Sequence, residues 1–280
     1  MANYDKESDS QAFWNEEGGS KWVENIDLVE GMMVPLSEEL LKAVDAKPGE
    51  KILDVGCGGG LTSFRLAEQV GEQGSVVGVD VSEPILEVAR QRSANATGIE
   101  FEQADAGSAE LGENQFDVIT SRFGVMFFDD PVQAFSNLQR ALKPSGRLVF
   151  MCWRGIEENP WLGDAARAAF GVVGPPAEKP DPKAPGPFSL GDAEHTEGIL
   201  ENAGFRDIQL EAMDKVMPFG QLDDVLAFLM KMGPVAEATS EADEGQMLAV
   251  EAAVREALGR YDTNEGLRTP GATWIVRAAS

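Results

Sequence analysis

The segment that most strongly suggests chemistry is the glycine-rich stretch ILDVGCGGG at 52–60. An apolar run that ends in glycines and precedes a helical pattern predicts a strand, a tight turn and a helix. Its glycines allow positive φ angles and let a ligand approach the backbone closely. They are Gly56, Gly58, Gly59 and Gly60. The N-terminus of the helix behind the turn favours negative groups, so we expect a nucleotide-type ligand here.

The glycine spacing excludes two common nucleotide motifs. A GxGxxG pattern counted from Gly56 would need glycine where Leu61 stands, and the chain has no GK[ST] triplet. Instead, Asp54 precedes the turn. A carboxylate there would repel a pyrophosphate and attract an ammonium or a sulfonium. S-adenosylmethionine, with its adenosine, sulfonium and amino acid tail, has this charge pattern.

Two further aspartates end the next two predicted strands. Asp80 follows Gly60 by 20 positions, where a carboxylate accepts hydrogen bonds from both ribose hydroxyls of a nucleotide. Asp105 ends the third strand and could accept from an adenine amino group. Each acid alone could be a strand-end cap. Three acids at successive strand ends indicate one binding edge more strongly than any of them singly.

The elements that would position these residues alternate between residues 50 and 150. The predicted strands are 51–55, 75–81, 99–105, 116–121 and 146–153. The predicted helices between them are 61–70, 84–96 and 131–142. Such alternation predicts a doubly wound α/β fold whose mostly parallel sheet carries helices on both faces. Ligands of such sheets bind outside the carboxyl ends of the strands.

The flanking segments differ from this core. We expect helices over 10–46 and 191–203, strands over 206–213 and 271–278, and a proline-rich loop over 174–188. The stretch 221–260 is mostly helical, with breaks expected near Gly233-Pro234 and at Gly245. We therefore divide the chain into three parts. They are an N-terminal helical segment (1–46), an S-adenosylmethionine-binding α/β domain (47–153 plus 191–220 and 266–280) and two cap insertions (154–190 and 221–265).

The composition of the chain limits the classes of molecule that it could bind. The formal net charge is −25, which disfavours nucleic acid and anionic membrane surfaces. With one histidine, His195, and two distant cysteines, Cys57 and Cys152, we expect neither a metal site nor a disulfide framework. No run approaches the roughly 18 apolar residues of a membrane span, and the N-terminus is polar. We expect a cytoplasmic protein with a small-molecule partner, and a homodimer is compatible with this interpretation.

Five segments resemble, in order and spacing, the motifs of class I S-adenosylmethionine-dependent methyltransferases. They are LDVGCGGG (53–60), VVGVDVS (76–82), ADA (104–106), FDVITSRFGVMFF (116–128) and LKPSGRLVF (142–150). The resemblance is close over about 45–153. The segment FWNEEGGSKWVEN (13–25) is similar to N-terminal segments of some bacterial small-molecule members. The resemblance implies a Rossmann-like, seven-stranded sheet whose last strand is antiparallel, with 206–213 and 271–278 as strands six and seven.

The resemblance also implies roles for individual residues. Asp54 and the Gly56 backbone would contact the methionine part, Asp80 the ribose, and Asp105 with Ala106 the adenine. Ser121, at the end of the fourth strand, would lie near the methyl group. The expected cofactor set is completed by Gly58, Val81 and Trp22. In one respect the chain departs from the family pattern, because residues 214–270 separate strands that usually form a near-direct hairpin.

The expected acceptor site lies beside the fourth and fifth strand ends. Arg122, Phe123, Phe127 and Trp153 would line it, with a salt bridge as the alternative for Arg122 and core packing as the alternative for the aromatic residues. Phe128 reads as core. Such a wall suits a small, enclosed acceptor with an aromatic or amine part.

The catalytic residues stay unknown at this stage. His195, Tyr4 and Tyr261 are scattered, and none is a convincing general base, so catalysis by proximity is the economical hypothesis. Asp129-Asp130 could be a metal pair but reads better as a helix cap, and Cys57 reads as a small filler. Two rivals remain: aminopropyl transfer, and a non-catalytic S-adenosylmethionine-binding regulatory or scaffold protein.

Overall fold

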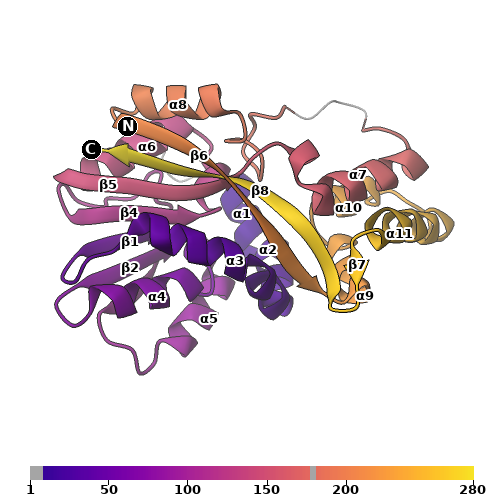
Figure 1. Ribbon diagram of the computed structural model, residues 1–280, viewed down its shortest axis with the longest axis horizontal. Helices are drawn as coiled ribbons and strands as arrows, with labels where there is room; N and C mark the ends of the chain where they lie inside the picture. The colour runs from indigo at the N-terminus through magenta and orange to yellow at the C-terminus, as the bar shows by residue number, and fades with distance from the viewer. Residues whose placement is uncertain (1–8, 177–180) are drawn as a thin grey trace.

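The computed structural model describes residues 9–176 and 181–280. Its centre is a sheet in the order β3-β2-β1-β4-β5-β8-β6 (Figure 1), and a two-residue strand, β7, pairs with β8. The strands are β1 (Lys51–Val55), β2 (Ser75–Asp80), β3 (Ile99–Gln103), β4 (Phe116–Arg122), β5 (Leu142–Trp153), β6 (Arg206–Gly220), β7 (Asp262–Thr263) and β8 (Gly266–Ala279). Strands β1 to β5 run parallel, and β8 is antiparallel to β5 and β6. This is the doubly wound, mostly parallel sheet predicted from the sequence.

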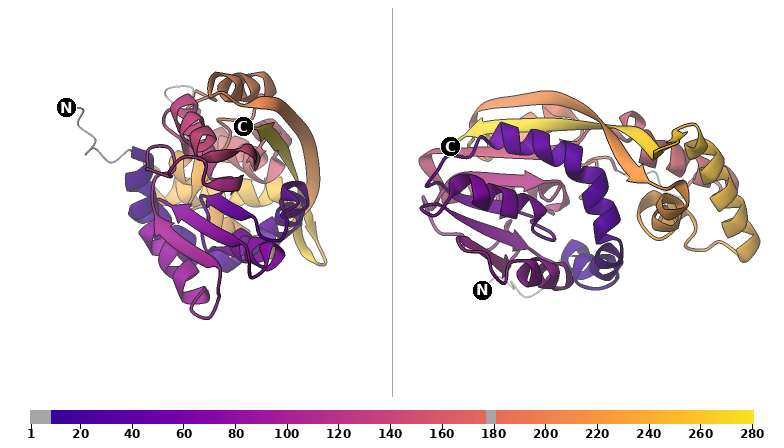
Figure 2. Two further views of the ribbon diagram at one scale, coloured as in Figure 1. Left: turned by 90° about the vertical axis from the view of Figure 1, so that its left-hand side faces the viewer. Right: turned by 60° about the horizontal axis from the view of Figure 1, so that its bottom comes forward.

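Helices cover both faces of the sheet. They are α1 (Asp9–Asn15), α2 (Glu17–Glu24), α3 (Ile26–Val44), α4 (Leu61–Val70), α5 (Glu83–Arg92), α6 (Pro131–Ala141), α7 (Pro160–Val173), α8 (Ala193–Asn202), α9 (Leu222–Leu229), α10 (Gly233–Ala238) and α11 (Glu244–Gly259). Helices α3, α4 and α5 pack on one face, and α6 and α8 pack together on the other (Figure 2). Coverage of both faces explains why β1, β4 and the second half of β5 are almost continuously buried.

Strands β6 and β8 are longer than predicted. They pair from Arg206↔Ala279 as far as Gly220↔Leu267, so they leave the sheet as a two-stranded ribbon (Figures 1 and 2). Beyond the sheet, the two strands satisfy each other's backbone hydrogen bonds. Many β6 side chains are exposed, which explains why apolar alternation did not reveal its full length.

The ribbon leads to a second group of helices. Helix α7, which follows β5, packs against α10 and α11, and α9 packs against α11 (Figure 1). Both predicted breaks of the helical stretch are found: α9 ends at Leu229 before α10 begins at Gly233, and α10 ends at Ala238 before α11 begins at Glu244. Pro234 fits at the start of α10 because the first turn of a helix needs no backbone donor. Among the described residues, no helix has both the length and the apolar composition to cross a bilayer.

Candidate active site

A cavity of about 390 Å³ opens at the carboxyl ends of β1, β2 and β4. The glycine turn after β1 forms its floor, with positive φ at Gly56, Gly58 and Gly60. A Cβ on Gly56 would come within 2.6 Å of the Gly124 Cα, so the turns after β1 and β4 pack backbone to backbone. A Cβ on Gly58 would meet no protein atom within 4 Å. Gly58 lines the cavity, and its missing side chain therefore leaves room for a ligand.

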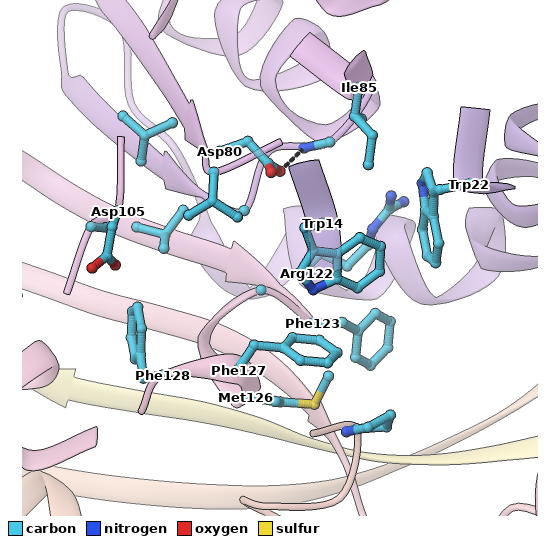
Figure 3. A pocket seen from close by; sticks show the side chains of 18 of the residues that line it. Trp14, Trp22, Asp80, Ile85, Asp105, Arg122, Phe123, Met126, Phe127 and Phe128 are labelled. Atoms are coloured by element: carbon cyan, nitrogen blue, oxygen red, sulfur yellow. Dashed lines mark hydrogen bonds between the residues drawn. The ribbon is translucent and has the colours of Figure 1, made fainter. Parts of the chain in front are cut away.

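Asp80 lies at the rim of this floor, at the end of β2. One carboxylate oxygen accepts from the Gly58 amide at 2.9 Å (the dashed bond in Figure 3), and the other accepts from the Ser82 amide at 3.0 Å. Burial raises the pKa of Asp80, and these backbone donors oppose the rise. Each oxygen can still accept a further hydrogen bond. Asp80 is thus positioned to bind a diol, and its neighbour Val81 lines the same cavity.

Asp105 lies in the turn after β3. One of its carboxylate oxygens accepts from the Gly107 amide at 2.9 Å, and the other accepts from the Ser108 hydroxyl at 2.6 Å. Asp105 and Ala106 both line the cavity. Figure 3 shows Asp80 and Asp105 around one part of the cavity, with most of the labelled aromatic rings gathered in another. The cavity therefore has a polar part and an aromatic part.

Two of the predicted cofactor residues do not line the cavity. Asp54 is 1% exposed and accepts from the Ser63 hydroxyl at 2.5 Å, so its contact is with α4. Burial raises the pKa of Asp54 to about 6. Ser121 is also buried: its hydroxyl donates to the Val55 carbonyl at 2.7 Å and accepts from the Gly124 amide at 3.1 Å. Both side chains hold the turns that form the floor.

Aromatic rings form the other part of the cavity. Phe123 and Trp153 are stacked, with ring centroids 4.2 Å apart and planes 9° from parallel. Phe123 has φ 66°, an uncommon value for a side chain of this size. Across the cavity, Trp14 makes edge contacts with Phe127 at 5.6 Å and with Trp22 at 5.5 Å (Figure 3). All five rings line the cavity, so the predicted positions of Trp22, Phe123, Phe127 and Trp153 are brought together.

Arg122 reaches the cavity from the end of β4. Its guanidinium donates to the Ser37 hydroxyl on α3 at 2.6 Å. Within the part of the chain that the structure describes, no carboxylate lies within 4.0 Å of it, so the alternative of a salt bridge is not found. Burial lowers the pKa of Arg122, and the more distant charges of Asp54 and Glu30 oppose this. An arginine nevertheless stays charged at neutral pH.

Several lining residues were not anticipated from the sequence. Trp14 comes from α1, Glu30 from α3 and Phe228 from α9. Trp161, from α7, also lines the cavity, and among the described residues its buried indole N–H has no hydrogen-bond partner. In the sequence, the only sign of such residues is a tryptophan within an otherwise polar helical segment. Phe128 was expected in the core, but it lines the cavity while it packs against Phe135.

Other candidates do not form a catalytic or metal-binding group. Asp129 and Asp130 line the cavity, but Asp130 caps α6 by accepting from the Gln133 amide at 3.0 Å, and no group of three or more potential metal ligands occurs among the described residues. Tyr261 donates to Asp164 at 3.0 Å, and neither it nor His195 lines the cavity. Cys57 is buried, which raises the pKa of its thiol. Tyr4 lies outside the described residues.

Comparison with known proteins identifies the family. A family model described as a methyltransferase domain matches residues 46–164. A demethylmenaquinone methyltransferase of Staphylococcus epidermidis is 30% identical over 180 residues, which are 61% of this chain and 74% of that protein. The chain belongs to the class I S-adenosylmethionine-dependent methyltransferases. An uncharacterized 37.1 kDa transposon protein of Streptomyces fradiae is 38% identical over 110 residues, and the chain spans only about a third (32%) of its length.

Solved structures support the fold of this methyltransferase. The YcgJ protein of Bacillus subtilis matches with a TM-score of 0.57 at 16% identity, covering 87% of this chain and 97% of that one. Phosphoethanolamine N-methyltransferase 2 of Haemonchus contortus, solved with S-adenosylhomocysteine, matches with a TM-score of 0.63 at 19% identity. That match covers 98% of this chain and 61% of that one. The methyl donor of the family to which the chain belongs is S-adenosylmethionine, and the carboxylate of Asp80 and the open space above Gly58 are compatible with such a ligand.

Proposed function

We propose that this methyltransferase transfers a methyl group from S-adenosylmethionine to a small, enclosed acceptor that has a planar aromatic or unsaturated part. The observation that carries the proposal is the cavity itself. Its polar part holds Asp80 and Asp105, and its other part is lined mainly by aromatic rings. A single cavity with two such parts suits a donor and an acceptor bound side by side.

The residues of the polar part suit the donor. We assign the ribose to Asp80, the adenine to Asp105 and Ala106, and the methionine part to the Gly56 and Gly58 backbone. We assign Asp54 and Ser121 to a supporting role, because their side chains hold the turns and do not line the cavity. The donor supplies a methyl group on a sulfonium, which is already a good leaving group. The chain's own contribution is then to align the acceptor and to exclude water.

The division of the chain follows the same assignment. We propose that 154–190 and 221–265 cover the acceptor and that 1–46 closes the opposite side. Trp161 and Leu162 come from the first insertion, and Phe228 comes from the second. Trp14 and Trp22 come from the N-terminal segment. Each of these parts therefore lends apolar side chains to a cavity whose floor belongs to the α/β domain.

A turnover assay tests the proposal. The purified protein is incubated with S-adenosylmethionine and single acceptors, and release of S-adenosylhomocysteine is followed by mass spectrometry. The panel includes phenols, aromatic carboxylates, amines, thiols and a reduced naphthoquinone. The last is included because the Staphylococcus epidermidis relative is named for demethylmenaquinone. We expect product with planar aromatic acceptors. Tight cofactor binding without product from any acceptor would instead support a binding or scaffold protein.

A further inference from the structure

The guanidinium of Arg122 has hydrogen-bonding capacity that the protein does not use. It carries five N–H donors, and one of its nitrogens donates to the Ser37 hydroxyl. In the described part of the chain it has no other hydrogen bond and no ion pair, although it lines the cavity. Figure 3 shows Arg122 among the labelled aromatic side chains and away from Asp105. A charged donor group therefore faces the aromatic part of the cavity.

The nearby carboxylates are otherwise engaged. Glu30 is paired with Arg92 at 2.7 Å, and Asp54 accepts from Ser63 and does not line the cavity. Asp80 accepts from two backbone amides near the glycine turn. Asp129 and Asp130 also line the cavity, but both are exposed to solvent where α6 begins, and Asp130 caps that helix. None of these groups is placed as a general base within the aromatic part of the cavity.

This arrangement favours an acceptor that arrives already ionised. We infer that the acceptor is a planar aromatic anion, a carboxylate or phenolate, whose charged oxygen binds Arg122 while its ring lies among the aromatic side chains. The inference rests on the proposed function and specifies its substrate class. An anion held by the half-buried Arg122 makes charge-assisted hydrogen bonds that a neutral molecule cannot match.

The reaction balances without a base. A lone pair of the anionic oxygen forms the O–CH₃ bond while the C–S bond breaks, and its electron pair stays on sulfur. One anion and one sulfonium become a neutral methyl ester or ether and neutral S-adenosylhomocysteine, and no proton moves. Loss of the two charges suits an apolar enclosure, where an ion pair is poorly solvated. An amine acceptor that arrives as an ammonium ion would first have to lose a proton, and methyl transfer would then create a new ammonium ion near Arg122.

Binding of three matched probes tests this inference. The probes are 2-naphthoate (anion), 2-naphthamide (neutral, nearly the same shape) and 2-naphthylmethylammonium (cation). Each is titrated calorimetrically into protein saturated with S-adenosylhomocysteine. We expect naphthoate to bind at least about tenfold more tightly than the other two, the size of one charge-assisted hydrogen bond. Arg122→Met should abolish this preference, and Arg122→Lys should retain part of it.

Controls separate this inference from its rivals. Arg277→Met, which removes an arginine of β8 that is paired with Glu211 of β6 and does not line the cavity, should keep the full preference. Circular dichroism and Tm verify that the variants fold. Absence of naphthoate binding, or tightest binding of the cation, would overturn the inference. So would a tenfold loss of S-adenosylhomocysteine affinity in Arg122→Met with the probe order unchanged, which would assign Arg122 to the cofactor's carboxylate. Because the probes need not react, failure of turnover alone would affect only the proposed function.

Discussion

Replacement of Asp80 by alanine should weaken S-adenosylhomocysteine binding by about a hundredfold. The carboxylate already accepts from the Gly58 and Ser82 amides, at 2.9 and 3.0 Å, and this fixes both oxygens at the cavity rim. Two ribose hydroxyls would add two hydrogen bonds to a charged acceptor, each worth about 1.5–3 kcal/mol. A loss of about 3 kcal/mol is the lower end of that sum, and it corresponds to roughly a hundredfold in Kd.

The same substitution also removes two anchors of the glycine turn, so affinity alone does not isolate the ribose contact. A double cycle that combines the protein variant with a ligand analogue isolates this contact. Wild type and Asp80→Ala are each titrated with S-adenosylhomocysteine and with its 2′-deoxy analogue. In wild type the missing hydroxyl should cost about tenfold, and in the variant less than threefold. An equal penalty in both proteins would refute the ribose assignment.

A second aspartate provides the matched control for this cycle. Asp192 is exposed, does not line the cavity, and caps α8 by accepting from the His195 amide at 2.7 Å. Asp192→Ala should lower Tm, because loss of a helix cap costs about 1 kcal/mol. It should leave the affinity for S-adenosylhomocysteine within about threefold of wild type. A large loss in both variants would indicate a general effect of removing acidic residues.

Three further predictions concern Gly58 in the floor of the cavity, Trp153 in its aromatic part and the buried Asp54. Gly58→Ala fills ligand space and should reduce cofactor affinity at least about tenfold, whereas Gly71→Ala, with a similar φ of 65° and equally open space, should affect only Tm. Trp153→Ala should raise the acceptor KM, measured by stopped-flow kinetics, and should leave cofactor affinity, measured by calorimetry, within about threefold of wild type. An unchanged KM would assign the ring to the core. The pKa of Asp54 is raised to about 6 in the fold from an ordinary 3.8, so the native state holds more protons and stability should fall as pH rises from about 4 to 6. Between pH 4 and 6 the free energy of unfolding, measured in urea, should fall by roughly 3 kcal/mol less for Asp54→Asn than for wild type. The same pH dependence in both proteins would show that another group titrates.

The floor of the site could be predicted from the sequence because it depends on local signals. Asp80 and Asp105 follow apolar strands of regular spacing, and parallel strands bring their carboxyl ends to one edge. The direction in which a side chain points at such a strand end could not be predicted in the same way. Asp54 is the last residue but one of β1, and alternation along the strand turns its carboxylate toward α4 and Ser63. Position in a motif therefore located the turn correctly without showing which atoms face the ligand.

The aromatic wall depends on packing between distant segments. Trp14 is fixed because the Ser82 hydroxyl donates to its carbonyl at 2.7 Å, a contact that joins α1 to the loop after β2. Trp161 and Phe228 meet the cavity only because α7 and α9 are brought to it from separate insertions. No periodicity within one helix encodes such a meeting, since each ring is one apolar residue among several on its own element.

The long β6–β8 ribbon explains how a helix far along the chain reaches the cavity formed by the α/β domain. In the sheet, β8 pairs with β5 up to Trp153↔Thr273, and beyond that point it pairs with β6 and, at its first residues, with the short β7. The ribbon thus leaves the sheet at the level of Trp153, the residue that stacks on Phe123. Its far end leads into α9, whose Phe228 reaches the cavity. Substitutions in the α9–α11 segment should therefore change acceptor choice while the glycine floor keeps its affinity for the donor, because Phe228 comes from this segment whereas Asp80 and the glycine turn belong to the α/β domain.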